Sequence, residues 1–195
     1  MTPQPKPGVP AIILAAGAGQ RLGEAKALVL WEGEALLQRA VRMAKAAGCH
    51  PILAVVRPGP IPLPELPVQW VPNPAAAEGM ASSIRAGLAA LPANAPGTLL
   101  MTVDQVRVEA SLLTQLLDCF HHHPNQPVAS AYAGTLGIPA IFPKGLFSAM
   151  GRLQGDQGAK GILLQETTLR VAFPGGEDDL DRPEDRLRLG ASSRD

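Results

Sequence analysis

Aromatic residues make up only 4% of this 195-residue sequence, and its 17 lysines and arginines are balanced by 17 aspartates and glutamates. Proteins that bind nucleic acids or anionic membranes usually carry an excess of positive charge, which this chain lacks. The small number of aromatic rings also argues against a surface on which the bases of a single strand would stack. We therefore expect neither a nucleic-acid partner nor a membrane partner.

Cysteines and long apolar segments are scarce as well. Cys49 and Cys119 are far apart and form no C-x-x-C motif, so we expect two reduced thiols and neither a disulfide framework nor a zinc site. No apolar run reaches the ~18 residues of a membrane-spanning helix. Residues 1–10 are rich in proline and lack the apolar segment of a secretory signal. These absences predict a cytoplasmic protein.

The sequence does contain a regular alternation of short apolar segments. Hydrophobic residues make up 46% and charged residues 17%, a balance that excludes a disordered chain. Alternating strand and helix patterns predict an α/β fold of three layers, in which a mainly parallel sheet carries helices on both faces. Strands are expected at residues 10–16, 52–56, 68–71, 98–103, 128–132, 138–142 and 169–173, and helices at 36–47, 81–91, 109–120, 159–165 and 183–189. We expect a single domain over residues 10–190, between a flexible lead (1–9) and a flexible tail (191–195).

A glycine-rich segment follows the first expected strand. Glycines at such a place let backbone N–H groups approach an anion closely, and Arg21 and Lys26 add charges suited to a triphosphate. The spacing G-x-G-x-x-x-G is one residue longer than the dinucleotide fingerprint, and no Walker A motif follows, so an ordinary turn is the alternative. The residues expected to bind substrate here are Leu14, Ala15, Ala16, Gly17, Gly19 and Gly23.

Acidic residues occur at two places where a metal ion would be useful. Asp104 ends the expected strand at 98–103, where a carboxylate is well placed to hold Mg²⁺ against phosphates; a turn cap is the alternative. Asp179 and Asp181 alternate, so they share a face if the segment is extended. One of them is expected to complete the metal site with Asp104, the alternative being a solvated charge run with a helix cap.

A polar segment before the helix at 81–91 contains further candidates. Ser82 and Ser83 lie near the helix start, where hydroxyls and free N–H groups can contact a ligand. With Asn73 and Gly79 they are predicted to bind the nucleotide, and simple capping is the alternative. The three histidines at 121–123 end a helix, where they complement the helix dipole better than they form a metal site.

In this order, the segments resemble the molybdenum cofactor cytidylyltransferase family, a branch of the nucleotidyltransferases. Residues 14–28 are similar to its motif L-A-A-G-x-x-x-R-x-G-x-x-K-x-L, and residues 73–87 to its N-x-x-x-x-x-G-M-x-x-S-x-x-x-G segment. Asp104-Gln105 resembles the start of its D-Q-P motif. Residues 155–160 resemble G-D-x-G-A-R/K, and residues 179–185 resemble D-I-D-T-P-E-D. The similarity extends over residues 12–187, almost the whole chain.

The resemblance implies a Rossmann-like nucleotidyltransferase that moves CMP from CTP to molybdenum-molybdopterin and releases pyrophosphate. It implies Mg²⁺ as the cofactor, Arg21, Lys26 and Asp104 as catalytic residues, and a recipient molybdoenzyme or its maturation chaperone as a further partner. Ala15-Ala16-Gly17 is closer to the cytidylyl branch than to the guanylyl branch, which has Ala-Gly-Gly at this place.

Two departures from the family pattern concern the acceptor side. Val106 replaces the proline after Asp-Gln, and Ile138 stands where the family often has histidine, which removes a hydrogen-bond donor. Three other functions remain open. They are a guanylyltransferase or other nucleotidyltransferase of the same fold, a nucleotide-dependent oxidoreductase of small molecules, and a non-catalytic carrier of molybdopterin.

Overall fold

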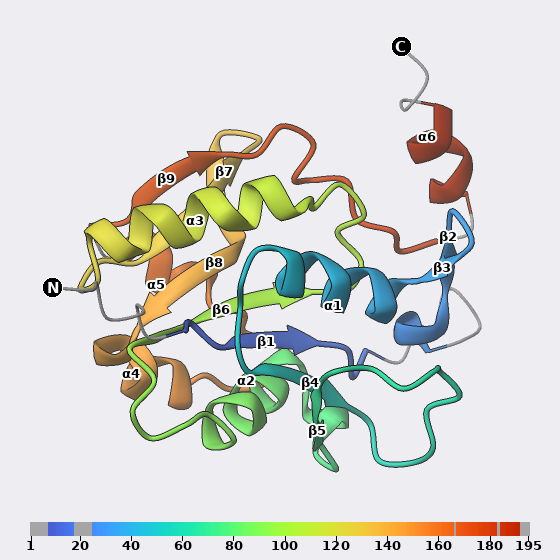
Figure 1. The fold of residues 1–195 in the computed structure, drawn as a ribbon, viewed down its shortest axis with the longest axis horizontal. Coiled ribbons are helices and arrows are strands. Elements are labelled where there is room, and N and C mark those ends of the chain that lie inside the picture. The colour runs from blue at the N-terminus through green and yellow to red at the C-terminus, as the bar shows by residue number, and fades with distance from the viewer. Residues whose placement is uncertain (1–7, 18–24, 166, 183, 192–195) are drawn as a thin grey trace, which may run out of the picture.

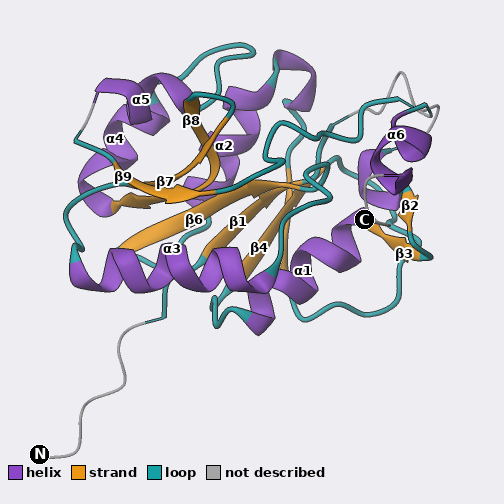
Figure 2. Ribbon diagram, turned by 90° about the horizontal axis from the view of Figure 1, so that it is seen from above, coloured by secondary structure: helices purple, strands orange, loops and turns teal. Residues whose placement is uncertain are grey.

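A seven-stranded sheet forms the middle layer of the protein (Figures 1 and 2). The computed structural model describes residues 8–17, 25–165, 167–182 and 184–191. In order across the sheet, the strands are β5 (Gln69–Pro72), β4 (Ile52–Val56), β1 (Ala11–Leu14), β6 (Gly97–Thr102), β8 (Thr135–Pro143), β7 (Val128–Tyr132) and β9 (Leu169–Ala172). Within this sheet β8 runs antiparallel to both neighbours and the other pairs are parallel.

The helices form the two outer layers (Figure 2). Helices α1 (Leu36–Ala46) and α3 (Ala110–His122) cover one face, and α2 (Met80–Ala89), α4 (Phe147–Gly151) and α5 (Lys160–Gln165) cover the other. Neighbouring side chains of β1 enter opposite cores: Ile13 lies in the cluster with α1 and α3, and Ile12 packs in the cluster with α2. Burial on both faces explains why this strand is apolar throughout. The expected three-layer α/β fold is confirmed.

The carboxyl ends of β1 and β6 meet at one edge of the sheet. A 3₁₀ turn, η1 (Lys26–Leu28), follows β1 there, and a small hairpin of β2 (Leu30–Trp31) and β3 (Glu34–Ala35) comes next. The C-terminal helix α6 (Asp185–Ala191) lies beside this hairpin (Figures 1 and 2). Further 3₁₀ turns are η2 (Ala76–Glu78), before α2, and η3 (Lys144–Leu146), before α4.

Several local expectations need correction. The sequence patterns missed the β2–β3 hairpin, whose turn places Glu32 at φ 51° and Gly33 at φ 83°, and they missed α4. Strand β8 begins at Thr135 and not at residue 138. Val9, expected in the flexible lead, is buried in the core, and its carbonyl accepts a hydrogen bond from His50 N. Residues 1–7 and 192–195 lie outside the described residues.

The two cysteines are unpaired, as expected. Burial raises the pKa of the Cys49 thiol to about 12 and raises that of Cys119 as well. Both groups therefore stay protonated near neutral pH, which makes them poor nucleophiles. Within the described part of the chain, no helix has both the length and the apolar character that crossing a bilayer requires.

Candidate active site at the carboxyl edge of the sheet

A cavity of about 510 Å³ opens at the carboxyl ends of β1 and β6. This volume is typical of sites for small molecules, which span roughly 300–1,000 Å³, and ligands of parallel sheets usually bind at this edge. Its walls come from the ends of β1, β4 and β6, from η1, from the start of α2 and from the acidic C-terminal segment. They are Leu14, Ala16, Gly17, Lys26, Arg57, Ala76, Gly79, Met80, Ser83, Thr102, Val103, Asp104, Asp156 and Asp181.

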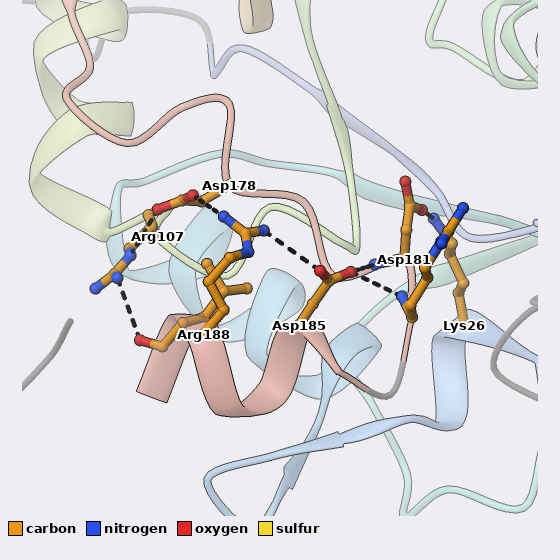
Figure 3. Close-up of polar contacts among 8 residues, drawn as sticks. Lys26, Arg107, Asp178, Asp181, Asp185 and Arg188 are labelled. Carbon is orange, nitrogen blue, oxygen red and sulfur yellow. Dashed lines mark hydrogen bonds and ion pairs between the residues drawn. The ribbon is translucent and has the colours of Figure 1, made fainter. Parts of the chain in front are cut away.

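Lys26 is at the centre of the charged side of this cavity. Its Nζ donates a hydrogen bond to Asp104 Oδ2 at 2.6 Å and another to Asp181 Oδ1 (Figure 3 shows Lys26 and Asp181). The side chains of Lys26 and Asp104 are 19% and 16% exposed, whereas that of Asp181 is 45% exposed. Burial alone would lower the pKa of Lys26, but attraction and hydrogen bonds from Asp104 and Asp181 raise it. Lys26 is therefore a firmly held cation.

The C-terminal segment brings Asp181 beside Asp104, far from it in sequence. Gln105 and Asp179 form an isolated antiparallel bridge, and Leu180 N donates to Asp104 O at 3.0 Å. Leu180 itself is fully buried. Alternation along an extended segment then turns Asp181 to the same side as Asp179. The predicted meeting of the two acidic segments is thus present in the structure.

Asp179 and Asp181 differ in their surroundings. Asp181 lines the cavity, whereas Asp179 is not among the lining residues. Burial, followed by repulsion from Asp104 and Asp181, raises the pKa of Asp179 to about 7. Among the described residues, no three histidine, cysteine, aspartate or glutamate side chains are arranged to hold a metal ion. Asp104 and Asp181 lie together beside Lys26, and the third carboxylate that lines the cavity, Asp156, comes from the segment packed on the start of α2.

The wall at the end of β1 was predicted in part. Leu14, Ala16 and Gly17, which were predicted to bind substrate, line the cavity, and Gly17 lies against the aliphatic chain of Lys26. Ala15 is buried, and its N–H donates to Val55 O at 2.8 Å. The predicted residues Gly19, Arg21 and Gly23 lie outside the described residues.

Arg57 is a cavity residue that the sequence reasoning missed. It follows β4, and its Nε donates to Ala16 O at 3.0 Å. This bond ties the end of β4 to the glycine-rich segment. A single arginine after a strand carries no motif, so only the pairing of β1 with β4 reveals its place.

The opposite wall is held together by a neutral polar network. Asn73 Nδ2 donates to Ser82 Oγ at 2.9 Å and to Ser83 Oγ at 3.0 Å, and Ser82 Oγ donates to Gly79 O at 2.8 Å. Asn73, Ser82 and Ser83 are all buried. Of the four residues predicted to bind the nucleotide here, Gly79 and Ser83 line the cavity, whereas Asn73 and Ser82 join the loop to α2 behind it.

Gly79 is required by its backbone and its neighbours. Its φ is 112°, a conformation that side chains rarely adopt, and a Cβ there would lie 2.4 Å from Asp156 Oδ1. Ala81 N also donates to Gly155 O at 3.0 Å. Residues 155–156 thus pack directly on the start of α2, which explains why Asp156 reaches the cavity.

The residues after Asp104 have a structural role. Gln105 Nε2 donates to Ile138 O at 2.9 Å and to Gly176 O at 3.2 Å, so Gln105 links β8 to the acidic segment. Val106, which replaces the family's proline, is buried, and Arg39 Nη2 donates to its carbonyl at 3.0 Å. His121 and His122 lie in the last turn of α3, as expected, and they are not among the cavity residues.

Comparisons with known proteins agree with this fold. Residues 11–170 match the MobA-like NTP transferase domain. Nicotine blue oxidoreductase of Paenarthrobacter nicotinovorans is 31% identical over 177 residues, which cover 84% of this chain and 85% of that protein.

Among solved structures, Rv0371c from Mycobacterium tuberculosis superposes with a TM-score of 0.77 and 26% identity, over 93% of this chain and 97% of that chain. A structure of Rv0371c in complex with manganese gives a TM-score of 0.74, with 24% identity over 95% and 99% of the chains. Molybdopterin-guanine dinucleotide biosynthesis protein A from Archaeoglobus fulgidus gives 0.70, with 13% identity over 96% and 100%, and so shares the fold. The chain therefore belongs to the MobA-like NTP transferase family.

Proposed function

We propose that this protein is a nucleotidyltransferase that moves CMP from CTP to the terminal phosphate of molybdenum-molybdopterin and releases pyrophosphate. The observation that carries the proposal is the Lys26 ammonium held between Asp104 and Asp181 inside a cavity of about 510 Å³. A cation and two carboxylates at the carboxyl edge of a parallel sheet are suited to a phosphate-bearing ligand. Membership of the MobA-like family supports the nucleotidyl-transfer chemistry.

The donor set fits a magnesium ion bound together with a nucleotide. Mg²⁺ prefers oxygen ligands and is usually held by one or two carboxylates with substrate phosphates and water. Asp104 and Asp181 provide two such carboxylates, and they share one ammonium group between them. The manganese complex of Rv0371c is consistent with a divalent cation in proteins of this fold. When bound, the ion would neutralise charge on the phosphates where attack occurs.

The chain's own residues then have separate tasks. Lys26 exchanges its carboxylate partners for phosphate oxygens and stabilises the charge that builds up on the leaving pyrophosphate. Asp104 and Asp181 would hold the divalent ion, whose charge would help to align the two phosphate groups, and alignment of two anions is the main task of this reaction. Gly79 and Ser83 face the nucleotide from the other wall. Gly19, Arg21 and Gly23 are proposed to complete the triphosphate site.

CTP is the proposed donor because Ala16 lines the cavity where the guanylyl branch has glycine. The additional Cβ narrows the space over the base and favours a pyrimidine. Molybdenum-molybdopterin is proposed as the acceptor from the resemblance to the cytidylyltransferase family, with a recipient molybdoenzyme or its chaperone taking the product. The catalytic residues proposed are Arg21, Lys26 and Asp104.

The test is a comparison of nucleotides in the presence of Mg²⁺. A ligand at 100 times its dissociation constant stabilises a protein by about 2.7 kcal/mol, a rise of several degrees in Tm for this size. We expect CTP to raise Tm more than GTP, ATP or NADPH, and radiolabelled CMP to pass from CTP to molybdenum-molybdopterin. Stabilisation by GTP alone would move the protein to the guanylyl branch, and binding of CTP without transfer would indicate a carrier.

Oxidation or reduction of a small molecule is a second candidate, because the 31% identical relative is a nicotine blue oxidoreductase. That activity would use the same cavity with a nicotinamide nucleotide. Stabilisation by NADPH in the presence of EDTA, with no response to CTP and Mg²⁺, would favour this second function over the first.

A further inference from the structure

The first residue of α6 is bonded to the backbone that carries Asp181. Asp185 Oδ2 accepts hydrogen bonds from Asp181 N at 3.0 Å and from Arg182 N at 2.8 Å (Figure 3). Hydrogen bonds to a carboxylate are stronger than those between neutral groups, so these two bonds hold the backbone of residues 181–182 in place.

Helix α6 is itself fastened to the rest of the domain. Arg188 Nη1 pairs with Asp178 Oδ1 at 2.8 Å, and Arg107 Nε pairs with the other oxygen of Asp178 at 3.4 Å. Arg107 Nη2 also donates to Leu189 O at 3.2 Å, and the Leu189 side chain is buried in the core. Figure 3 shows these contacts as one row that leads from Arg107 to Asp181. Asp185 thus projects from a helix with a fixed position.

Asp181 needs such support more than Asp104 does. Asp104 follows the buried Val103 just after β6, and its side chain is 16% exposed, whereas Asp181 lies in an irregular segment and its side chain is 45% exposed. Lys26 holds the Asp181 carboxylate in the absence of ligand. Once Lys26 turns to phosphate oxygens, that ion pair is lost, while the bonds from Asp185 to the backbone of Asp181 remain available.

We infer that Asp185 is a positioning residue: it fixes the backbone of Asp181 so that this carboxylate and Asp104 can hold one divalent cation against the nucleotide. The inference rests on the proposed function. Asp185 itself does not line the cavity, so it acts through Asp181 and not by touching the nucleotide. Groups that orient metal ligands typically change metal affinity by about 10–100-fold when they are replaced.

The experiment uses the full chain and measures Mn²⁺ binding in the presence of CTP, by the electron paramagnetic resonance signal of free Mn²⁺. For Asp185→Ala we expect the Mn²⁺ dissociation constant to rise about tenfold. Hydrogen exchange at the amides of Asp181 and Arg182, measured without metal, should become faster in the same variant. Asp185→Asn keeps an acceptor oxygen of the same reach and should restore most of the affinity.

Two control variants separate positioning from general loosening. Arg188→Gln removes the ion pairs of α6 with Asp178 and Asp185 but leaves the bonds from Asp185 to the backbone, and the bond from Arg107 to Leu189 O still holds the helix, so the affinity should fall much less than in Asp185→Ala. Asp118→Ala removes an exposed carboxylate on α3 and should have no effect. Melting curves show whether each variant is folded.

The outcomes for the two proposals differ. If the unmodified chain does not bind Mn²⁺ with CTP, the proposed function fails and the inference fails with it. If the unmodified chain binds and Asp185→Ala binds equally well, the inference alone is wrong. It is also wrong if Arg188→Gln weakens Mn²⁺ binding as much as Asp185→Ala, because the docking of α6 as a whole would then be the cause.

Discussion

The two walls of the cavity differ in how their polar groups are paired. The neutral wall contains Asn73, Ser82 and Ser83, and the charged wall contains Lys26, Asp104 and Asp181. On the neutral wall, Asn73 satisfies the hydroxyls of Ser82 and Ser83, and all three side chains are buried. On the charged wall, the single ammonium of Lys26 serves both Asp104 and Asp181. The first network joins neutral groups, whereas in the second two carboxylates share one ammonium group.

This difference separates groups that maintain the fold from groups that await a ligand. A satisfied buried network contributes to stability, and breaking it leaves polar atoms without partners. At Asp179, burial and then repulsion from the neighbouring carboxylates raise the pKa. Substitutions on the neutral wall should therefore lower stability, and substitutions on the charged wall should mainly lower activity.

Lys26→Ala should give the largest effect. Removing this charge should cost on the order of 3 kcal/mol of transition-state stabilisation, or about a hundredfold in the rate of CMP transfer. The measurement is kcat with saturating CTP and Mg²⁺, and Lys45→Ala, an exposed lysine on α1, is the matched control. Near-normal turnover by Lys26→Ala would show that the charged wall does not act on the triphosphate.

Asp104→Asn should weaken the binding of Mg²⁺ and so raise the concentration of Mg²⁺ that activity requires. The amide keeps the shape of the side chain but loses its charge, so the Mg²⁺ concentration for half-maximal activity should rise by at least about tenfold. A titration of activity with Mg²⁺ measures this shift, and Asp118→Asn provides the control. Unchanged activity in limiting Mg²⁺ would contradict the assignment of Asp104 as a metal ligand.

Asn73→Ala, on the neutral wall, should lower stability more than it lowers activity. It leaves the buried hydroxyls of Ser82 and Ser83 without their donor, which should cost about 1–3 kcal/mol and lower Tm by roughly 2–10 °C. The rate should fall less than in Lys26→Ala. Thermal melting provides the measurement, with the exposed Asn125→Ala as control. A large loss of activity at unchanged Tm would mean that Asn73 contacts substrate directly.

The sequence predicted the layers of the fold well, because buried strands and amphipathic helices have distinct apolar patterns. The strand at 52–56 and the strand at 128–132 were predicted at their observed bounds. The direction of β8 was not predictable, since an apolar run reads the same in either orientation. The β2–β3 hairpin was missed because its strands have two residues each, too few to show a period.

The charged wall was easier to predict than the neutral one. Asp104 comes just after β6, and Lys26 belongs to the segment that follows β1, so both are expected at the carboxyl edge of the sheet. Ser82 resembles a ligand-binding hydroxyl in sequence, but its bond to Asn73 shows a role within the fold. Arg57 belongs to no motif, and Asp185 ends the motif-like segment 179–185 without a role that the motif assigns to it. The roles of both follow from contacts that only the folded chain creates.

The smallest effect that we predict is a change of stability with pH. Asp179, beside the charged wall, should cause it, and EDTA keeps metal ions from binding during the measurement. The folded pKa of Asp179, about 7, lies above the ordinary value of 3.8, so the folded state binds this proton more tightly than the unfolded chain. Stability should therefore fall as pH rises from about 4 to about 7. Asp179 as a whole residue is exposed at the surface although neighbouring atoms partly desolvate its carboxyl group, so solvent screens the repulsion and limits the change to about 1–2 °C in Tm.

Asp179→Asn should remove this slope and raise Tm slightly above pH 7, while Glu177→Gln, an exposed neighbour, should leave the slope as it is. Melting curves at several pH values provide the measurement. Added Mg²⁺ and CTP should flatten the slope in the unmodified chain as well, because bound positive charge offsets the repulsion among the carboxylates. A slope that persists in Asp179→Asn would place the excess charge elsewhere and remove the contrast between the two walls.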